Sequence, residues 1–276
     1  MAKPYLVCID SDGCVFDTME IKHKECFCPS YIKHFGLQAV SKYARDAWDF
    51  ANLYSATRGI HRLLALRRAL DVLENRREVL ERNFKVTRLQ ALRDYIDQGG
   101  NLSNQGLEEH LAKHPELTEL RTVLDWSYDV NVRVGDMVHS VPPFPFVREC
   151  LEKLSQVADI VIVSATPEEA LEREWKEHGL FPLLLAVKGQ ESGNKKEIIA
   201  SLKRNYDPDK ILMLGDAPGD RDAALKNNVL YYPILVRNEF ESWTTFKNEA
   251  LDKFLNGTFA GDYQAELLDA FVKNLS

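Results

Sequence analysis

The sequence of 276 residues predicts an α/β protein, in which a doubly wound parallel sheet carries an all-helical inserted domain. Three observations predict this class. Short apolar runs recur along the chain, amphipathic helical patterns separate the later ones, and a long stretch without a convincing strand pattern follows the first run. Alternating strands and helices imply right-handed crossovers, and therefore a parallel sheet covered by helices on both faces.

The expected strands are five short apolar runs. They comprise Tyr5 to Ile9, Asp159 to Val163, Leu183 to Val187, Lys210 to Leu214 and Tyr231 to Val236. The helices expected around the later strands comprise Phe146 to Gln156, Pro167 to His178, Lys195 to Asn205 and Arg221 to Lys226. From Asn238 onward we expect helices that pack on the core, with Trp243 as a candidate anchor.

The exception to this alternation lies between Asp17 and Ser140, where long amphipathic patterns such as Ile60 to Leu80 and Leu89 to Ile96 predict helices only. A block of this length is too long for a connection. The stiff segment Pro142-Pro143-Phe144-Pro145 is typical of a domain boundary. We therefore expect a core of residues 1–17 and 141–276 and a helical domain of residues 18–140.

The composition excludes several classes of protein. Hydrophobic residues make up 45% and charged residues 28%, which is ordinary for a globular chain, and the net charge of -7 argues against general nucleic-acid binding. The five cysteines form no disulfide framework, and no apolar run approaches membrane-spanning length. Because the expected first strand leaves no room for a signal peptide, we expect a reduced, cytoplasmic protein with neither nucleic acid nor membrane as a partner.

Two carboxylates, Asp10 and Asp12, follow the first expected strand in the segment Asp10-Ser11-Asp12-Gly13. Side chains at i and i+2 emerge on the same side of an extended backbone, and open parallel sheets bind ligands at the carboxyl ends of their strands. Asp10 can attack an electrophile such as phosphorus, and Asp12 can protonate the leaving oxygen and later deprotonate water. The alternative is a polar strand end with a tight turn at Gly13.

A second acidic pair, Asp216 and Asp220, follows the strand expected at Lys210 to Leu214. Carboxylates brought together at one sheet edge repel one another, and a divalent cation removes that cost. Oxygen ligands on a short loop suit Mg²⁺, which takes only a few carboxylates. Asp220 has the alternative role of N-cap for the helix that follows.

Two further segments carry groups that favour an anion. Ser164 precedes a capping-box pattern from Thr166 to Glu169, which predicts a helix N-terminus facing whatever Ser164 contacts. A second capping box, Asn194 to Glu197, places Lys195 and Lys196 in a first helical turn, where cations oppose the helix dipole unless an anion binds. The alternatives are an incidental serine and two solvated lysines.

Together, these four segments resemble the four motifs of the haloacid dehalogenase superfamily of phosphohydrolases. The resembling residues are, in motif order, Asp10-x-Asp12-Gly13, Ser164, Lys195 and Gly215-Asp216-x-x-x-Asp220. The resemblance covers residues 1–17 and 141–276, and it implies a Rossmann-like core with the helical insertion as a cap over the substrate. Lys195 is preferred to Lys196 because Ile199 and Leu202 give it the helix phase usual for the third motif.

The resemblance implies roles for the four aspartates. Asp10 is the nucleophile, and Asp12 is the general acid and base. The metal is Mg²⁺, held by Asp10, by the backbone carbonyl of Asp12 and by the acidic pair Asp216 and Asp220.

The same resemblance assigns the phosphate-binding groups to Ser164, Ala165 and Lys195. It implies Mg²⁺-dependent hydrolysis of a small phosphorylated metabolite through an aspartyl-phosphate intermediate. Two departures are minor: Cys14 replaces the usual threonine or valine, and Ser11 replaces a larger apolar residue.

Asp12 distinguishes between the chemistries of this superfamily. Its dehalogenases lack an acid at this position, because carbon–halogen cleavage needs no proton donor, so Asp12 favours phosphate monoesters. A phosphomutase or a phosphonate hydrolase is the alternative within the fold; Asp17-Thr18 and His23 resemble sugar phosphomutases, although the spacing to His23 is one residue longer. A non-catalytic phosphometabolite-binding protein is the alternative outside enzymes, and the pair Asp10 and Asp12 counts against it.

The inserted domain contains a basic segment from Arg58 to Arg93, with ten basic residues against four acids. This excess of positive charge can draw a phosphorylated substrate, and the alternative is a solvated helix face with i,i+4 ion pairs. The segment Ala56-Thr57-Arg58-Gly59 interrupts the helical pattern, so Arg58 is a candidate contact to the substrate.

Overall fold

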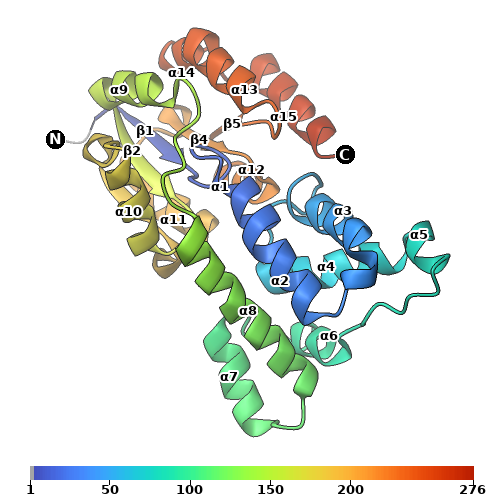
Figure 1. Cartoon of the computed structure of the whole chain (residues 1–276). Coiled ribbons are helices and arrows are strands. Elements are labelled where there is room, and N and C mark those ends of the chain that lie inside the picture. Colours follow the sequence, from blue (N-terminus) through green and yellow to red (C-terminus); the bar gives the residue numbers. More distant parts are fainter. Residues whose placement is uncertain (1–2) are drawn as a thin grey trace. The chain divides into compact units, whose positions relative to one another are not determined.

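Five parallel strands form one sheet with the spatial order β3-β2-β1-β4-β5 (Figure 1). The structure is a computed structural model that describes residues 3–276. The strands are β1 (Tyr5–Ile9), β2 (Ala158–Val163), β3 (Ala186–Lys188), β4 (Ile211–Gly215) and β5 (Leu230–Pro233). This arrangement confirms the α/β class and the parallel, doubly wound sheet that the sequence predicts.

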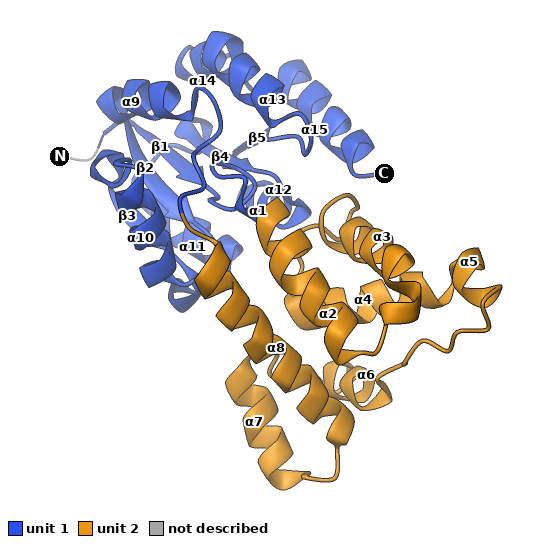
Figure 2. Ribbon diagram, in the orientation of Figure 1, with its two compact units in different colours: residues 1–19, 140–276 blue, residues 20–139 orange. Residues whose placement is uncertain are grey.

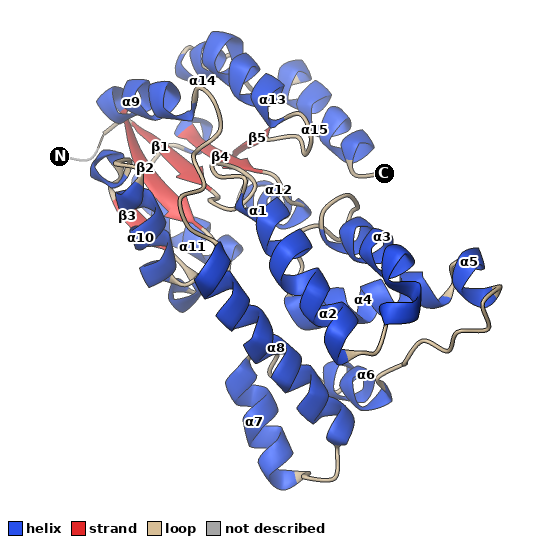
Figure 3. Cartoon of the chain, in the orientation of Figure 1, coloured by secondary structure: helices blue, strands red, loops and turns tan. Residues whose placement is uncertain are grey.

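Helices account for most of the remaining chain (Figure 3). Those before β2 are α1 (Thr18–Ile21), α2 (Cys28–His34), α3 (Ser41–Asn52), α4 (Arg62–Glu74), α5 (Arg77–Leu80), α6 (Gln90–Asp97), α7 (Asn104–Lys113), α8 (Thr118–Met137) and α9 (Val147–Val157). The later ones are α10 (Glu168–Glu177), α11 (Lys195–Leu202), α12 (Pro218–Lys226), α13 (Glu239–Thr245), α14 (Leu251–Leu255) and α15 (Asp262–Asn274). None of the helices in residues 3–276 combines the length and the apolar character needed to cross a bilayer.

The chain divides into two compact units (Figure 2). Unit 1 comprises residues 1–19 and 140–276 and contains the whole sheet, and unit 2 comprises residues 20–139 and is helical. The sequence predicts these boundaries at 17/18 and 140/141, and the division of the structure falls at 19/20 and 139/140. At the second boundary the return segment is fixed within unit 1, because the Phe144 amide donates to the Val15 carbonyl at 2.9 Å.

The core of unit 1 explains why its strands read as continuous apolar runs. Leu6, Val7, Cys8 and Ile9 of β1 are all fully buried, although successive side chains of a strand point to opposite faces of the sheet. Both faces of β1 are therefore covered, as expected for a central parallel strand. The helices of the C-terminal segment are also present, and Trp243 on α13 is fully buried, as the sequence predicts.

Several predicted boundaries are wrong where proline or a capping residue intervenes. The third strand is Ala186–Lys188 rather than Leu183 to Val187. Pro182 directly precedes the predicted run, and the chain forms a 3₁₀ turn there, Phe181–Leu183, before the strand begins. The pattern from Ile60 to Leu80 forms two helices, α4 and α5, separated at Asn75, rather than one. The last strand is Leu230–Pro233 rather than the predicted Tyr231 to Val236, and it ends at a proline.

Unit 2 has its own core of aromatic and aliphatic side chains, including Trp48, Trp126 and Leu66, which are all fully buried. Large aromatic groups of this kind bury enough surface to stabilise a helical unit. A polar contact also joins two of its helices, since Asp129 on α8 accepts a hydrogen bond from Ser30 on α2 at 2.8 Å.

We predict that Asp129→Asn lowers the stability of unit 2. Burial by itself raises the pKa of Asp129, but the hydrogen bond from Ser30 and the charge of Arg133 prevail and hold this pKa at about 2. The unfolded carboxyl group binds a proton at higher pH, so its stabilising effect is complete above about pH 4 and is lost as the pH falls toward 2. Because the side chain is partly open to solvent, we expect a loss of about 1–2 kcal/mol at pH 7.

Urea unfolding of Asp129→Asn at neutral pH and near pH 3 measures this effect. Asp125, which is exposed on the same helix, provides the matched control as Asp125→Asn. The loss in Asp129→Asn should shrink at the lower pH. An equal loss in both variants, or a loss that does not depend on pH, would contradict the charged role of Asp129.

Candidate active site

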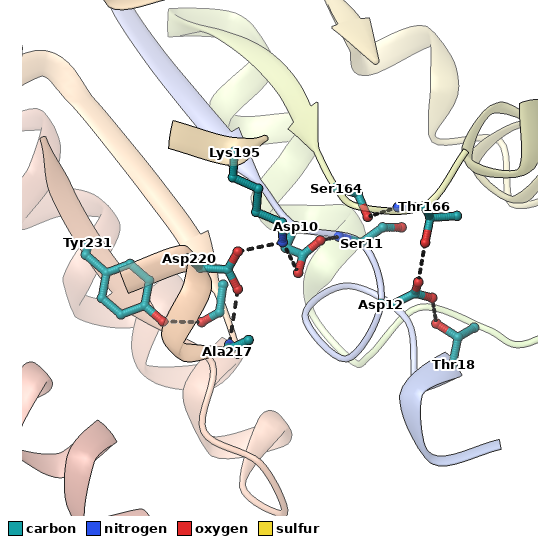
Figure 4. A network of polar contacts seen from close by, with 11 residues as sticks. Asp10, Ser11, Asp12, Thr18, Ser164, Thr166, Lys195, Ala217, Asp220 and Tyr231 are labelled. Carbon is teal, nitrogen blue, oxygen red and sulfur yellow. Dashed lines mark hydrogen bonds and ion pairs between the residues drawn. The ribbon is translucent and has the colours of Figure 1, made fainter. Parts of the chain in front are cut away.

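Three buried carboxylates meet at the carboxyl ends of the two central strands; Figure 4 shows two of them, Asp10 and Asp220. β1 and β4 are parallel neighbours, with Ile9 paired to Leu214, so the residues that follow them, Asp10 and Asp216, emerge side by side. Asp220 approaches from the first turn of α12. Ligand oxygens of Asp10, Asp216 and Asp220 all lie within 4.8 Å of one another.

Lys195 places its ammonium group between two of these carboxylates (Figure 4). Its Nζ lies 2.6 Å from Asp10 Oδ2 and 2.6 Å from Asp220 Oδ1. The lysine is the first residue of α11, and Asn194 caps this helix by accepting from the Glu197 amide at 3.0 Å, as predicted. The helix phase therefore selects Lys195, whereas Lys196 is exposed.

Burial dominates the electrostatics of this group. It raises the pKa of Asp10 to about 6, against the opposing charge of Lys195, and it also raises the pKa of Asp220. Burial alone would lower the pKa of Lys195, but the charges of Asp10 and Asp220 more than compensate and raise it. Lys195 thus contacts two of the three buried carboxylates. The mutual repulsion of carboxylates this close together favours a cation bound among them.

The donor set determines which cation fits. Asp10, Asp216 and Asp220 offer only carboxylate oxygens, and hard oxygen ligands of this kind suit Mg²⁺ rather than a softer metal. The residues present therefore fit the magnesium ion that the sequence predicts. The Asp12 carboxylate is outside this three-residue group.

Asp220 combines a place in this group with a local role in its helix. Its Oδ2 accepts a hydrogen bond from the Ala217 amide at 3.1 Å, although Ala217, and not Asp220, is the N-cap residue of α12. Asp220 also packs directly on Gly215, where an added Cβ would lie 2.4 Å from the Asp220 Cβ. Glycine is therefore required at the end of β4. The Tyr231 hydroxyl donates to the Gly215 carbonyl at 2.9 Å and supports the same turn.

Two hydroxyl groups hold the Asp12 carboxylate (Figure 4). Thr166 donates to its Oδ2 at 2.7 Å, and Thr18, the first residue of α1, donates to its Oδ1. The predicted capping box of Thr166 is therefore wrong: α10 begins at Glu168, and its N-cap residue is Pro167. The Glu168 amide donates to Glu191 Oε2 at 3.0 Å instead. The Thr166 hydroxyl donates to the charged Asp12 carboxylate, because a carboxylate is a stronger acceptor than a neutral group.

The loop after β2 contains the other two residues expected to bind phosphate. Ser164 is buried, its amide donates to the Lys188 carbonyl at 3.0 Å, and its Oγ accepts from the Thr166 amide at 3.3 Å. Ala165 is exposed, and within residues 3–276 its amide makes no hydrogen bond. That amide can therefore donate to an anion.

Glu168 connects this loop to the loop that leads to Lys195, a contact that the sequence analysis missed. Its Oε1 accepts from the Gly189 amide at 3.1 Å, and the Gln190 amide donates to the Thr166 carbonyl at 3.1 Å. A Cβ added at Gly189 would lie 2.5 Å from the same carbonyl, so the two loops touch through their backbones. The spacing between Ser164 and Lys195 is thereby constrained.

Two further contacts support the loop that follows β1, and the sequence gives little sign of them. The Trp175 indole donates to Ser11 Oγ at 3.0 Å, and Ser11 Oγ donates to the Glu174 carboxylate at 3.1 Å. Ser11 therefore has polar partners on α10, which accounts for a hydroxyl where the family resemblance leads one to expect an apolar side chain. Trp243 donates to the Cys14 carbonyl at 2.9 Å.

Arg58 lies in unit 2 and is almost fully buried. Its Nη1 donates to the Leu53 carbonyl at 2.9 Å. Five arginines of the basic segment form ion pairs with carboxylates, but of these pairs only Arg77 with Glu81 is an i,i+4 pair of the kind expected for a solvated helix face. The five are Arg67, Arg76, Arg77, Arg88 and Arg93.

Comparison with solved structures identifies the fold. A protein from Bacteroides fragilis described as a haloacid dehalogenase-like hydrolase matches with a TM-score of 0.51 and 14% sequence identity, over 87% of this chain and 93% of that chain. No family model and no curated protein matches the sequence. At this level of identity the similarity concerns the fold. It is the fold of the haloacid dehalogenase-like hydrolases, as the sequence motifs predict.

Two other solved structures align over similar lengths. A haloacid dehalogenase-like family protein from Streptococcus pneumoniae has a TM-score of 0.47 and 12% identity, over 87% of this chain and 90% of that chain. A protein from Haemophilus somnus, described as a predicted phosphoglycolate phosphatase, has a TM-score of 0.48 and 15% identity, over 84% of this chain and 86% of that chain.

Proposed function

We propose that this protein is a Mg²⁺-dependent phosphatase of the haloacid dehalogenase superfamily, which hydrolyses a small phosphorylated metabolite through an aspartyl-phosphate on Asp10. The observation that carries the proposal is the meeting of Asp10, Asp216 and Asp220 within 4.8 Å of one another, with the Lys195 ammonium group in contact with Asp10 and Asp220. A pair of acids at the end of one strand fits both a nucleophile and a proton donor, which binding alone would not require.

In the first step, a carboxylate oxygen of Asp10 forms a bond to phosphorus, and the bond between phosphorus and the ester oxygen breaks. Asp12 gives its proton to the departing oxygen, so the product leaves as a neutral alcohol. Thr166 and Thr18 orient the Asp12 carboxyl group for this transfer, because each contacts a different oxygen.

In the second step, Asp12 accepts a proton from water as the water oxygen attacks phosphorus. The bond between phosphorus and Asp10 then breaks, which regenerates the carboxylate and releases inorganic phosphate. Lys195, Ser164 and the Ala165 amide hold the phosphoryl oxygens during both steps, and Lys195 offsets the negative charge that Asp10 presents to the phosphate.

Asp10, Asp216 and Asp220, with the Asp12 backbone carbonyl, would hold the magnesium ion, which would supply positive charge that favours the approach of an anionic ester to a carboxylate. We assign unit 2 the recognition of the leaving group, with Arg58 as a candidate contact. This assignment follows the division into a catalytic core and a cap that the sequence resemblance implies.

We predict that magnesium chelation abolishes the activity. A panel of phosphate monoesters is incubated with the full chain, and release of inorganic phosphate is measured with Mg²⁺, with EDTA, and with EDTA followed by excess Mg²⁺. Activity should disappear with EDTA and return with Mg²⁺, because three buried carboxylates otherwise repel one another and the substrate.

Full activity in metal-free buffer would contradict the metal requirement. Transfer of phosphate between sugar positions without release of inorganic phosphate would indicate a phosphomutase instead. Binding of phosphate esters without any turnover would indicate the non-catalytic alternative.

A further inference from the structure

Arg62, in unit 2, is a partly buried arginine that contacts only neutral groups. It is the first residue of α4, and its Nη1 donates to Ser127 Oγ at 3.0 Å and to Asn131 Oδ1 at 2.7 Å, both on α8. A third contact joins Nη1 to the Ser127 carbonyl at 3.4 Å. No carboxylate among residues 3–276 forms an ion pair with this guanidinium group.

Other arginines of the same segment are arranged differently. Arg67, five residues further along α4, pairs with Asp97 at 2.8 Å, and Arg88 pairs with Glu74 at 2.8 Å. Burial of a charge is costly unless an opposite charge compensates for it. For Arg62, burial lowers the pKa of the guanidinium group, and no acidic side chain opposes that shift.

The orientation of the guanidinium group leaves one edge available. Nη1 is fixed by Ser127 and Asn131, and the plane lies near the Phe27 ring, with Cζ 5.3 Å from the ring centroid. Within the described chain, Nε and Nη2 make no hydrogen bond, yet neither atom is sealed from solvent. The edge formed by Nε and Nη2 is the one that binds a carboxylate or a phosphate with two parallel hydrogen bonds.

The surroundings add to the positive potential. The first turn of α4 contains no acidic residue, so the charge of Arg62 adds to the positive end of the helix dipole. The neighbouring His61 carries no charge at neutral pH, because burial and the charge of Arg62 lower its pKa to about 4. An anion bound at this position would offset the positive charge of Arg62 and of the α4 N-terminus.

We propose that Arg62 binds an anionic group, a carboxylate or a phosphate, of a small ligand through its Nε and Nη2 atoms. The anion has two possible sources: a second anionic group on the substrate, which rests on the proposed function, or a free anion that binds unit 2 independently of catalysis.

The first experiment tests binding directly. The full chain, labelled with ¹⁵N and kept in EDTA to prevent turnover, is titrated with inorganic phosphate while the arginine Nε–H resonances are recorded. The Arg62 resonance is assigned by its absence in Arg62→Lys. We expect it to shift saturably while that of Arg67 does not, and no saturable shift at tens of millimolar phosphate would overturn the proposal.

The second experiment distinguishes the sources. The ratio of kcat/KM for phosphoglycerate to that for the matching glycerol phosphate compares two esters in which a hydroxymethyl group replaces the carboxylate. In Arg62→Met this ratio should fall about 10- to 100-fold relative to wild type, and Arg67→Met should leave it unchanged. An unchanged ratio in Arg62→Met, with the phosphate-dependent shift present in the wild-type spectrum, assigns the site to a free anion. The spectrum decides the Arg62 proposal whether or not either ester is hydrolysed, and phosphate release from the wider panel of esters decides the proposed function.

Discussion

Asp10→Asn should lose turnover by about 10⁴-fold or more and keep its fold. The carboxamide oxygen is a poor nucleophile, so no aspartyl-phosphate can form, and loss of a nucleophile of this kind removes most of the catalytic advantage. Inorganic phosphate release under saturating Mg²⁺ measures the effect. Activity within about tenfold of wild type would show that Asp10 is not the nucleophile.

The fold of this variant has a physical reason to persist. Asparagine has nearly the volume of aspartate, and Lys195 still has Asp220 as a partner at 2.6 Å. Burial raises the pKa of Asp10 to about 6, so a neutral group at this position removes an unfavourable buried charge at neutral pH. The urea midpoint in EDTA should therefore not fall. A large fall would mean that lost activity reports unfolding.

Asp12→Asn provides a contrast within the same strand end. It removes the proton donor but leaves the nucleophile, so its loss should be large for a sugar phosphate and small for an activated aryl phosphate, whose leaving group needs no proton. Equal losses for the two substrates would argue against an acid role for Asp12, whatever the result for Asp10.

The central part of the site was predictable because it depends on local patterns. A buried apolar run predicts each central strand, and the parallel order of β1 and β4 then brings Asp10 beside Asp216 without any knowledge of side-chain packing. The position of Lys195 follows from helix phase in the same way. The strand ends and the first turns of the helices are thus the features that a sequence pattern describes best.

The parts that were not predictable depend on pairs far apart in the chain. The spacing of Thr166 to Glu169 fits a helix cap, but the Thr166 hydroxyl donates to Asp12, 154 residues away. The contact of Gly189 with the Thr166 carbonyl and that of Ser11 with Trp175 are of the same kind. Local spacing cannot reveal such partners, since the packing of separate loops creates them.

Lys195→Ala should lose about 10²–10³-fold in turnover, whereas Lys196→Ala should remain nearly as active as wild type. Lys195 is the cation that contacts both Asp10 and Asp220, at 2.6 Å each, and it has the position needed to neutralise phosphoryl charge in the transition state. Lys196 points about 100° further round the helix and is exposed. Steady-state kinetics of the two alanine variants on one ester, at saturating Mg²⁺, measure the difference.

A second measurement separates this electrostatic role from simple support of the fold. Without Lys195, three buried carboxylates have no ammonium group to offset their charge, so the metal-free variant should unfold at lower urea concentration than wild type. Added Mg²⁺ should then raise the midpoint of Lys195→Ala by more than that of wild type, because the ion replaces the missing positive charge. Lys196→Ala should show the wild-type increment. If Mg²⁺ stabilises all three proteins equally, Lys195 and the metal do not share the charge of Asp10 and Asp220, and the lysine acts only on the phosphate.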